Sequence, residues 1–515
     1  MLLVEWKTYK EKYKSIIIFT FLWGILTHGI MMFNKFSFFD ELHYMFGVGH
    51  TYSLGRWMLG LLESTTRFLF SSPLFSLPLL NGAVSLLGIA ISVCFIVRII
   101  EVENKWSIFT ICGLMVAFPT ITCMFGYMYT APYYMIGLVF AVAGVRCVCS
   151  EEMQWYKVVA GAFLLACAIG VYQALIPLAL SLLLMYFMNQ IRKKRIENWK
   201  GFLKQTFYLG SFCVLALAIY YVILKVILKV MNLELFGYKG ADSLIPFNIG
   251  EYKWRIILAY KEFFAPSGEN EYLFWNVHPW NMEKIYTILL VLVILIGIYV
   301  VYSLFREKPS YGVWYGGMFA LLPLAVNFIF VMVDKWSVYA LTNYAQVMIF
   351  IFFIWQIENI KIEKASINKW IYGIGISLML FSGIFYSRYA NVCYLNAELM
   401  TNQMTSYYTT LITRIQSMEG YKDEMPVAFI NGGKKQDLNW PVGEEFKEIA
   451  IEAYRWDTTI NDNSWNSFMK YYCGYEPVIV EDTNSYEQMQ EVADMPVYPD
   501  DGSIAIIDDV IIIKF

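Results

Sequence analysis

Residues 15–33 read SIIIFTFLWGILTHGIMMF, an unbroken apolar run long enough to cross a bilayer. A helix rises about 1.5 Å per residue, so about 20 apolar residues cover the roughly 30 Å of hydrocarbon in a membrane. The composition agrees, with 58% hydrophobic residues, 16% charged residues and a mean hydropathy of +0.49. Soluble domains carry about 25% charged residues. We therefore expect a polytopic α-helical membrane protein.

Similar runs recur along three-quarters of the chain and predict about eleven transmembrane helices. They lie approximately at residues 15–33, 74–99, 106–124, 132–149, 157–173, 175–190, 206–228, 285–304, 313–332, 339–356 and 370–387. The fifth and sixth runs are joined near GVYQALIP, where Pro177 is a natural break because proline lacks the N–H that a continuous helix needs. If the two runs were a single helix, every later segment would change sides of the membrane.

Lysine and arginine decide the orientation, because cytoplasmic loops collect them. The strongest basic cluster, IRKKR at Ile191–Arg195, follows the sixth run and is expected on the inner side. The lysines before the first run agree with this placement when the N-terminus is cytoplasmic. An odd number of spans then puts the C-terminus outside. The predicted location is a multi-pass protein of the cell membrane, whether plasma or inner membrane.

Two outer loops follow from this topology, at residues 34–57 and 231–284. The second contains IGEYKWRIILAYKEFFAP, in which apolar residues recur at helical spacing with basic residues between them. Such a stretch is expected to lie along the membrane interface rather than to span it.

The C-terminal region differs in charge from the rest of the chain. Residues 388–515 carry 9 Lys and Arg against 21 Asp and Glu, a net charge of −12, whereas the remainder carries +9. Short apolar runs such as PVAFI and SIAIIDDVIIIKF alternate there with helical patterns, which predicts a small α/β domain. We expect a transmembrane domain at 1–387 and an extracytoplasmic domain at 388–515. No concentrated basic face indicates nucleic-acid binding.

The first outer loop contains FSFFDELHYMFGVGHTYSLGRW, at Phe36–Trp57. It gathers charged and imidazole side chains in an aromatic setting: Asp40, Glu41, His43, His50 and Arg56. Acids near lipid lose solvation, so they usually have a task. A carboxylate can take a proton from a sugar hydroxyl as it attacks an activated carbon. A neighbouring arginine can hold a departing phosphate.

Each residue in this loop also has a plainer interpretation. Asp40 and Glu41 could be solvated interfacial acids, or could favour a helix N-terminus through its dipole. Arg56 could extend toward lipid headgroups. The acids and a histidine could instead hold a divalent metal ion, although no spacing here specifies one. Apart from that metal, no cofactor is expected.

Several of these motifs together resemble the glucosyltransferase II family, membrane enzymes that include serotype-converting O-antigen glucosyltransferases. FFDELHYMFGVGHTYSLGRWMLGLLE is similar to the family's opening, where an acidic pair precedes a Gly-Arg-Trp element. The matching residues here are Asp40, Glu41, Gly55, Arg56 and Trp57. GVYQA resembles a later Tyr-Gln element, at Tyr172 and Gln173, and MPVYPDDGSIAIIDDVIIIKF resembles the family's C-terminal tail. The second acid departs from the commoner Asp-Asp pair.

The resemblance implies a GT-C-type fold and an inverting glycosyltransferase. Such an enzyme takes a sugar, here expected to be glucose, from a polyprenyl-phosphate carrier and places it on a cell-surface polysaccharide or glycolipid. In that scheme Asp40 is the general base, Glu41 orients the acceptor or shares the proton, and Arg56 neutralises the carrier phosphate. Candidate substrate contacts are Trp57, His43, His50, Tyr172 and Gln173.

Other functions remain open from the sequence. A flippase or transporter for a lipid-linked glycan would need charged residues deep in several spans, and the mid-span positions are overwhelmingly apolar. A polysaccharide polymerase or ligase usually works through arginine-rich outer loops, which are not evident. A non-catalytic scaffold would use the C-terminal domain for docking. The sequence leaves open whether Cys393 and Cys473 form a disulfide.

Overall fold

The computed structural model describes residues 2–37, 40–47, 49, 51–149, 153–236, 249–265, 278–333, 337–360, 362, 364–431, 446, 449, 451, 454 and 464–515. The chain divides into two compact units. The first comprises Met1–Asn34 and Phe46–Asn391, and the second comprises Lys35–Met45 and Val392–Phe515. A short segment after the first long helix thus belongs with the C-terminal region.

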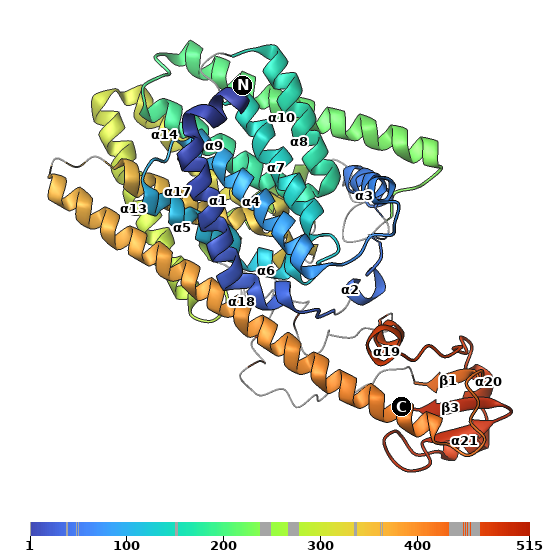
Figure 1. The fold of residues 1–515 in the computed structure, drawn as a ribbon. Coiled ribbons are helices and arrows are strands. Elements are labelled where there is room, and N and C mark those ends of the chain that lie inside the picture. Colours follow the sequence, from blue (N-terminus) through green and yellow to red (C-terminus); the bar gives the residue numbers. More distant parts are fainter. Residues whose placement is uncertain are drawn as a thin grey trace. The chain divides into compact units, whose positions relative to one another are not determined.

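The first unit is helical (Figure 1). Its α-helices are α1 (Leu2–Phe33), α3 (Trp57–Phe70), α4 (Pro78–Ile100), α5 (Lys105–Ala117), α6 (Pro119–Phe125), α7 (Ala131–Val148), α8 (Trp155–Val171), α9 (Ile176–Arg192), α10 (Trp199–Met231), α11 (Ile249–Phe264), α13 (Met282–Glu307), α14 (Pro309–Ala320), α15 (Leu322–Val326), α16 (Ile329–Met332), α17 (Val347–Asn359) and the first part of α18 (Ala365–Gln416). Short 3-10 helices η1 (Gln173–Leu175), η3 (Ala340–Thr342) and η4 (Tyr344–Gln346) connect some of them.

All eleven predicted apolar runs fall on these helices. Among the described residues, seven helices are long and apolar enough to span a membrane, or eight if α5 and α6, bent by 45° at their junction, form one span. The chain is therefore a membrane-embedded helical protein, while the count of eleven stays a prediction. The amphipathic stretch of the second outer loop forms α11, and its position along a membrane interface likewise stays a prediction.

Besides the run at 106–124, which is bent between α5 and α6, two more predicted runs are broken within the helical unit. The run at 313–332 forms three short helices, α14 to α16, and the run at 339–356 begins with two 3-10 turns before α17. Buried amides satisfy polar groups at these breaks: Asn327 donates to the carbonyl of Ala259 at 3.0 Å and accepts from the side chain of Gln346. Irregular backbone at membrane depth is tolerated where protein groups satisfy it in this way.

The predicted break near Pro177 is confirmed. Helix α8 ends at Val171, Tyr172 has an extended backbone (φ −157°, ψ 116°), and α9 begins at Ile176 with Pro177 in its first turn. Proline suits that position because the first N–H groups of a helix have no partner within it. The polar pair at Tyr172 and Gln173 therefore lies at a gap between two helices rather than on the face of one.

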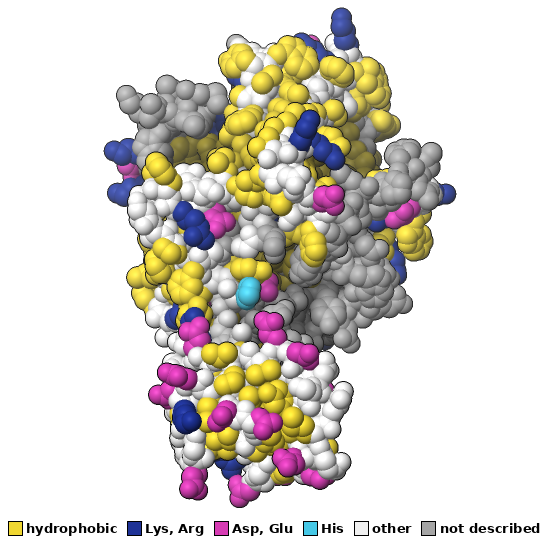
Figure 2. Space-filling view, turned by 90° about the vertical axis from the view of Figure 1, so that its right-hand side faces the viewer, with side chains coloured by type: hydrophobic (Ala, Val, Ile, Leu, Met, Phe, Trp, Pro, Cys, Tyr) yellow, Lys and Arg dark blue, Asp and Glu magenta, His cyan; other side chains and the backbone are white. Residues whose placement is uncertain are grey.

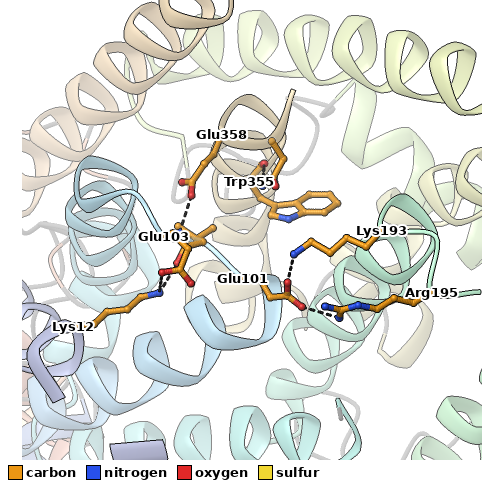
Figure 3. Close-up of polar contacts among 9 residues, drawn as sticks. Lys12, Glu101, Glu103, Lys193, Arg195, Trp355 and Glu358 are labelled. Atoms are coloured by element: carbon orange, nitrogen blue, oxygen red, sulfur yellow. Dashed lines mark hydrogen bonds and ion pairs between the residues drawn. The ribbon is translucent and has the colours of Figure 1, made fainter. Parts of the chain in front are cut away.

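Ion pairs join helix ends at one end of the first unit (Figure 3). Lys12 on α1 pairs with Glu103 at 3.1 Å, just after α4. Glu101, which ends α4, pairs with Lys193 and with Arg195 at 2.9 Å, just after α9. The first helix, the 98–105 connection and the basic cluster thus share one end of the helical unit, as the charge pattern predicts for segments on one side of a membrane. Which side this is stays a prediction.

The second unit contains the expected small α/β arrangement. Its three-stranded sheet has the order β1-β3-β2, with β1 (Val427–Ile430) parallel to β3 (Val510–Lys514) and β2 (Ile504–Ile507) antiparallel to β3. The hairpin turn at Asp508 and Asp509 has positive φ at both residues, the geometry of two-residue hairpins. Its other helices are α2 (Asp40–His43), α19 (Trp465–Cys473), α20 (Asn484–Glu487) and α21 (Gln490–Asp494). Acidic side chains are spread over its visible face (Figure 2).

Helix α18 is continuous for 52 residues (Figure 1). The predicted span at 370–387 lies within this helix, which continues into the C-terminal region because no proline interrupts it. Among the described residues, neither Cys393, on this helix, nor Cys473 forms a disulfide. A predicted helix at GEEFKEIAIEAY lies mostly outside the described residues.

Close packing of α7 on α8 gives the first testable prediction. A Cβ at Gly144 would lie 2.8 Å from the carbonyl oxygen of Gly161, so Gly144→Ala must push the helices apart. We expect a loss of about 1–3 kcal/mol in stability, seen as a lower thermal unfolding midpoint of the full chain in detergent. Gly210→Ala is the matched control, because its Cβ would have no neighbour within 4 Å. Equal midpoints for both variants would contradict the packing.

Candidate functional site

The Gly-Arg-Trp element forms a tight turn that leads into α3. The N–H of Gly55 donates to the carbonyl of Tyr52 at 3.0 Å, and the N–H of Arg56 donates to the carbonyl of Thr51 at 2.9 Å. Gly55 has a φ of +74°, a conformation that side chains with a Cβ rarely adopt. Glycine is thus required for the turn that places Arg56 and Trp57 at the start of the helix.

The Tyr-Gln element meets this turn. Gln173 donates from Nε2 to the carbonyl of Leu54 at 3.1 Å and to the hydroxyl of Tyr220 at 3.2 Å. Tyr220, on α10, donates in turn to the carbonyl of Gly55 at 3.1 Å. Two motifs more than a hundred residues apart in sequence are therefore joined by a network of three hydrogen bonds. The loop before α3 is held to the gap between α8 and α9.

Trp57 packs into the same region. Its indole lies against Gly170, where a Cβ would come within 2.5 Å of the ring. The ring forms a buried cluster with Cys167, Leu224 and Leu228. Its Nε1 is buried and has no hydrogen-bond partner among the described residues. The tryptophan therefore anchors the start of α3 and keeps one unused donor.

Arg56 lies among tyrosines. Its guanidinium carbon is 5.1 Å from the centroid of the Tyr172 ring, a cation–π contact. The ring of Tyr172 packs against that of Tyr134 at an interplanar angle of 31°, with centroids 4.9 Å apart, and Tyr129 and Tyr339 are close enough to interact with the guanidinium electrostatically. The Nε of Arg56 is buried without a hydrogen bond, and among the described residues Arg56 forms no ion pair. A half-buried cation that has no counter-charge among its described neighbours is suited to receive an anion.

The acid pair belongs to the second unit. Asp40 begins the one-turn helix α2 and is half-buried, whereas Glu41 is fully buried. The carboxylate of Glu41 pairs with the ammonium of Lys35 at 2.5 Å. The two neighbouring acids therefore have different surroundings.

Tyr472 on α19 contacts the same segment, donating from its hydroxyl to the carbonyl of Lys35 at 3.1 Å. Burial, with the negative charge of Glu41 adding to it, raises the pKa of Tyr472 to about 12. The hydroxyl consequently keeps its proton at physiological pH and can donate this bond.

The histidines have separate environments. His43 is exposed and lies edge-on to the ring of Tyr44, with centroids 4.6 Å apart, and His50 lies outside the described residues. His28 contacts the carbonyl of Val116 at 3.0 Å and stacks on Phe125 within the helical unit. Among the described residues, no group of three or more His, Cys, Asp or Glu side chains is arranged to hold a metal ion.

Sequence reasoning missed Tyr220, Tyr134, Tyr129 and Tyr339 around the arginine, and Lys35 and Tyr472 beside the acids. Tyrosine is common in this chain, with 38 copies, so its type alone singles out none of them. Of the candidates, the structure brings together Arg56, Trp57, Tyr172 and Gln173 in the first unit. Asp40, Glu41 and His43 lie in the second.

Comparison with known proteins adds one finding. The family described as "Glucosyl transferase GtrII" matches residues 29–352, more than half of the chain. Neither a curated protein nor a solved structure matches the chain significantly.

The turn before α3 gives the second prediction. In Gly55→Ala the new Cβ would lie 2.7 Å from the Tyr220 hydroxyl and 3.0 Å from Nε2 of Gln173, besides being strained at φ +74°. We expect the loop to shift and the thermal midpoint to fall, with a loss of about 1–3 kcal/mol. Gly420→Ala separates the two causes, because its φ is +87° but its nearest neighbour would be 4.0 Å away. A Gly55→Ala variant no less stable than this control would show that the network does not constrain the turn.

Proposed function

Because the chain belongs to the GtrII glucosyltransferase family, we propose that it moves a sugar, expected to be glucose, from a polyprenyl-phosphate carrier to a cell-surface polysaccharide or glycolipid. Membership makes the protein a glycosyltransferase that acts on a sugar donor and an acceptor. The lipid carrier, the acceptor and the outer face of the membrane are the proposed refinements. They are supported by the apolar helices and by the chemistry of the two groups of residues described above.

The observation that carries the proposal is the half-buried Arg56, whose Nε is buried without a hydrogen bond and whose guanidinium forms no ion pair among the described residues. Transfer breaks the bond between C1 of the sugar and the phosphate oxygen, and the electron pair stays with the polyprenyl phosphate. Charge therefore grows on that phosphate in the transition state. A cation fixed in advance in a low-dielectric setting stabilises such charge without reorganising. Arg56 is proposed to hold this phosphate, and the unused Nε1 of Trp57 offers a further donor.

Asp40 is proposed as the general base. It would accept the proton of the acceptor hydroxyl as the oxygen attacks C1 from the side opposite the phosphate, so the configuration at C1 inverts. Its half-buried position is compatible with access for an acceptor. Glu41, fully buried and paired with Lys35, is less suited to share the proton. His43 and His50 remain proposed contacts to the substrates.

Tyr172 and Gln173 are proposed to act at the donor. Gln173 donates to the carbonyl of Leu54 in the arginine loop, and Tyr172 offers an aromatic face to the guanidinium. Family membership favours glycosyl transfer over the flippase, polymerase and scaffold alternatives. Turnover of a labelled donor separates them, since a flippase would move the lipid without forming a new glycosidic bond.

Replacing Arg56 tests the phosphate role. With purified protein and a radiolabelled polyprenyl-phosphate glucose, Arg56→Met should lower kcat/KM about 10²–10³-fold, because one charge-assisted interaction with the leaving phosphate is lost. Arg56→Lys should recover only part of this, since lysine keeps the charge but not the planar donor fork.

Arg67 provides the matched control on the same helix. It is partly exposed and already paired with Glu63 at 3.0 Å, so Arg67→Met should leave transfer nearly unchanged. Parent-level transfer by Arg56→Met would overturn the assignment.

Replacing Asp40 tests the base. Asp40→Asn keeps the size of the side chain but cannot accept the proton, so kcat should fall about 10²–10⁴-fold in the same assay, with the donor KM little changed. Asp423→Asn, an exposed acid of the same unit, serves as the control and should transfer at the parent rate. An Asp40→Asn protein that still transfers sugar at the parent rate would remove Asp40 from the mechanism.

A further inference from the structure

We propose that the C-terminal region holds the proposed base in place, through Tyr472 and the ion pair of Lys35 with Glu41. These three are positioning residues for Asp40, and the inference rests on the proposed function of that aspartate. It assigns the acidic C-terminal domain a part in catalysis and gives Glu41 a role different from that of its neighbour.

The first support is the make-up of the second unit. Residues Lys35–Met45 separate from the helices on either side of them in sequence and group with Val392–Phe515. Within this unit α2, which carries the acid pair, packs against α19. The segment is thus attached to the C-terminal region by contacts made within one compact body.

The second support is the short length of α2. A helix of four residues closes barely one turn, and helix nucleation is unfavourable without outside contacts. The position of Asp40 therefore depends on what its neighbours bind. Among these neighbours, Lys35 is bound through its backbone carbonyl and its ammonium, and Glu41 is bound through its carboxylate.

Tyr472 is itself rigidly held. Its ring stacks on Phe468, one turn earlier in α19, with an interplanar angle of 2° and centroids 4.7 Å apart. Phe468 is fully buried and packs near Tyr408 on α18. The hydroxyl that binds the carbonyl of Lys35 is therefore fixed by the core of the unit, as an accurate anchor requires.

The buried ion pair completes the anchor. Glu41 is fully buried, and the ammonium of Lys35 supplies the opposite charge that such a carboxylate requires. A pair of this kind fixes geometry, because removing either partner leaves the other charge uncompensated. Glu41 thus orients the segment that carries Asp40.

The test uses the full chain and the variant Tyr472→Phe, which keeps the ring stack but loses the hydroxyl. We expect kcat to fall roughly tenfold with the donor KM unchanged, because the base is displaced while phosphate binding is not. Hydrogen–deuterium exchange of residues 35–47 should rise at the same time. Tyr471→Phe, the exposed neighbour on the same helix, should change neither quantity.

A double-mutant cycle on the ion pair adds a second readout. Lys35→Met and Glu41→Gln should each lower kcat about tenfold, and the double variant should be no worse than either single one, since both remove the same interaction. If Glu41→Gln abolishes transfer while Lys35→Met does not, and exchange of residues 35–47 is unchanged, Glu41 acts directly and the inference is wrong.

Asp40→Asn, assayed in parallel, separates this inference from the proposed function. One outcome is that Asp40→Asn loses transfer while Tyr472→Phe keeps the parent kcat and the parent rate of hydrogen–deuterium exchange. That outcome overturns only the proposed positioning role of Tyr472. Full transfer by Asp40→Asn overturns the proposed base, and exchange of residues 35–47 in Tyr472→Phe then still reports whether the anchor exists.

Discussion

The break between α8 and α9 is the constraint on which the arginine site depends. A polar amide in an apolar helical unit is unfavourable unless it finds partners, and so are loop carbonyls that have left a helix. Gln173 and the carbonyl of Leu54 satisfy one another at 3.1 Å, and Tyr220 extends the arrangement to Gly55. With the loop fixed from two sides, the guanidinium of Arg56 is held over an aromatic ring rather than free to reach toward lipid headgroups.

Sequence patterns identified the arginine and the Tyr-Gln pair separately, because each belongs to a short recognisable motif. They did not show that the two meet, since that depends on how α3, α8 and α10 pack. Tyr220 illustrates the limit. It lies beside Tyr221 in AIYYVILK, and no local pattern distinguishes the half-buried network member from its exposed neighbour.

For the fold, apolar length was an adequate guide to where helices lie and a poor guide to where they break. Pro177 marks one break in the sequence. The divided run at 313–332 depends instead on a hydrogen bond that Asn327 accepts from Gln346, nineteen residues later. The grouping of residues 35–45 with the C-terminal region was equally hidden. Its contacts join parts of the chain that are far apart in sequence, and no local pattern in either part indicates the other. The change in charge near residue 388 placed only the residues after it in the C-terminal region.

The contact between Lys35 and Tyr472 joins residues 437 positions apart, close to the two ends of the chain. Synthesis proceeds at about 5–20 residues per second, so roughly 20–90 s separate the two on the ribosome. During that interval the helices between them can enter the membrane, while the segment that carries the acids cannot yet contact Tyr472. The region around Tyr472 therefore completes the first loop only after the intervening helices have been made, and a product that stops before Tyr472 would carry the acidic pair without this contact.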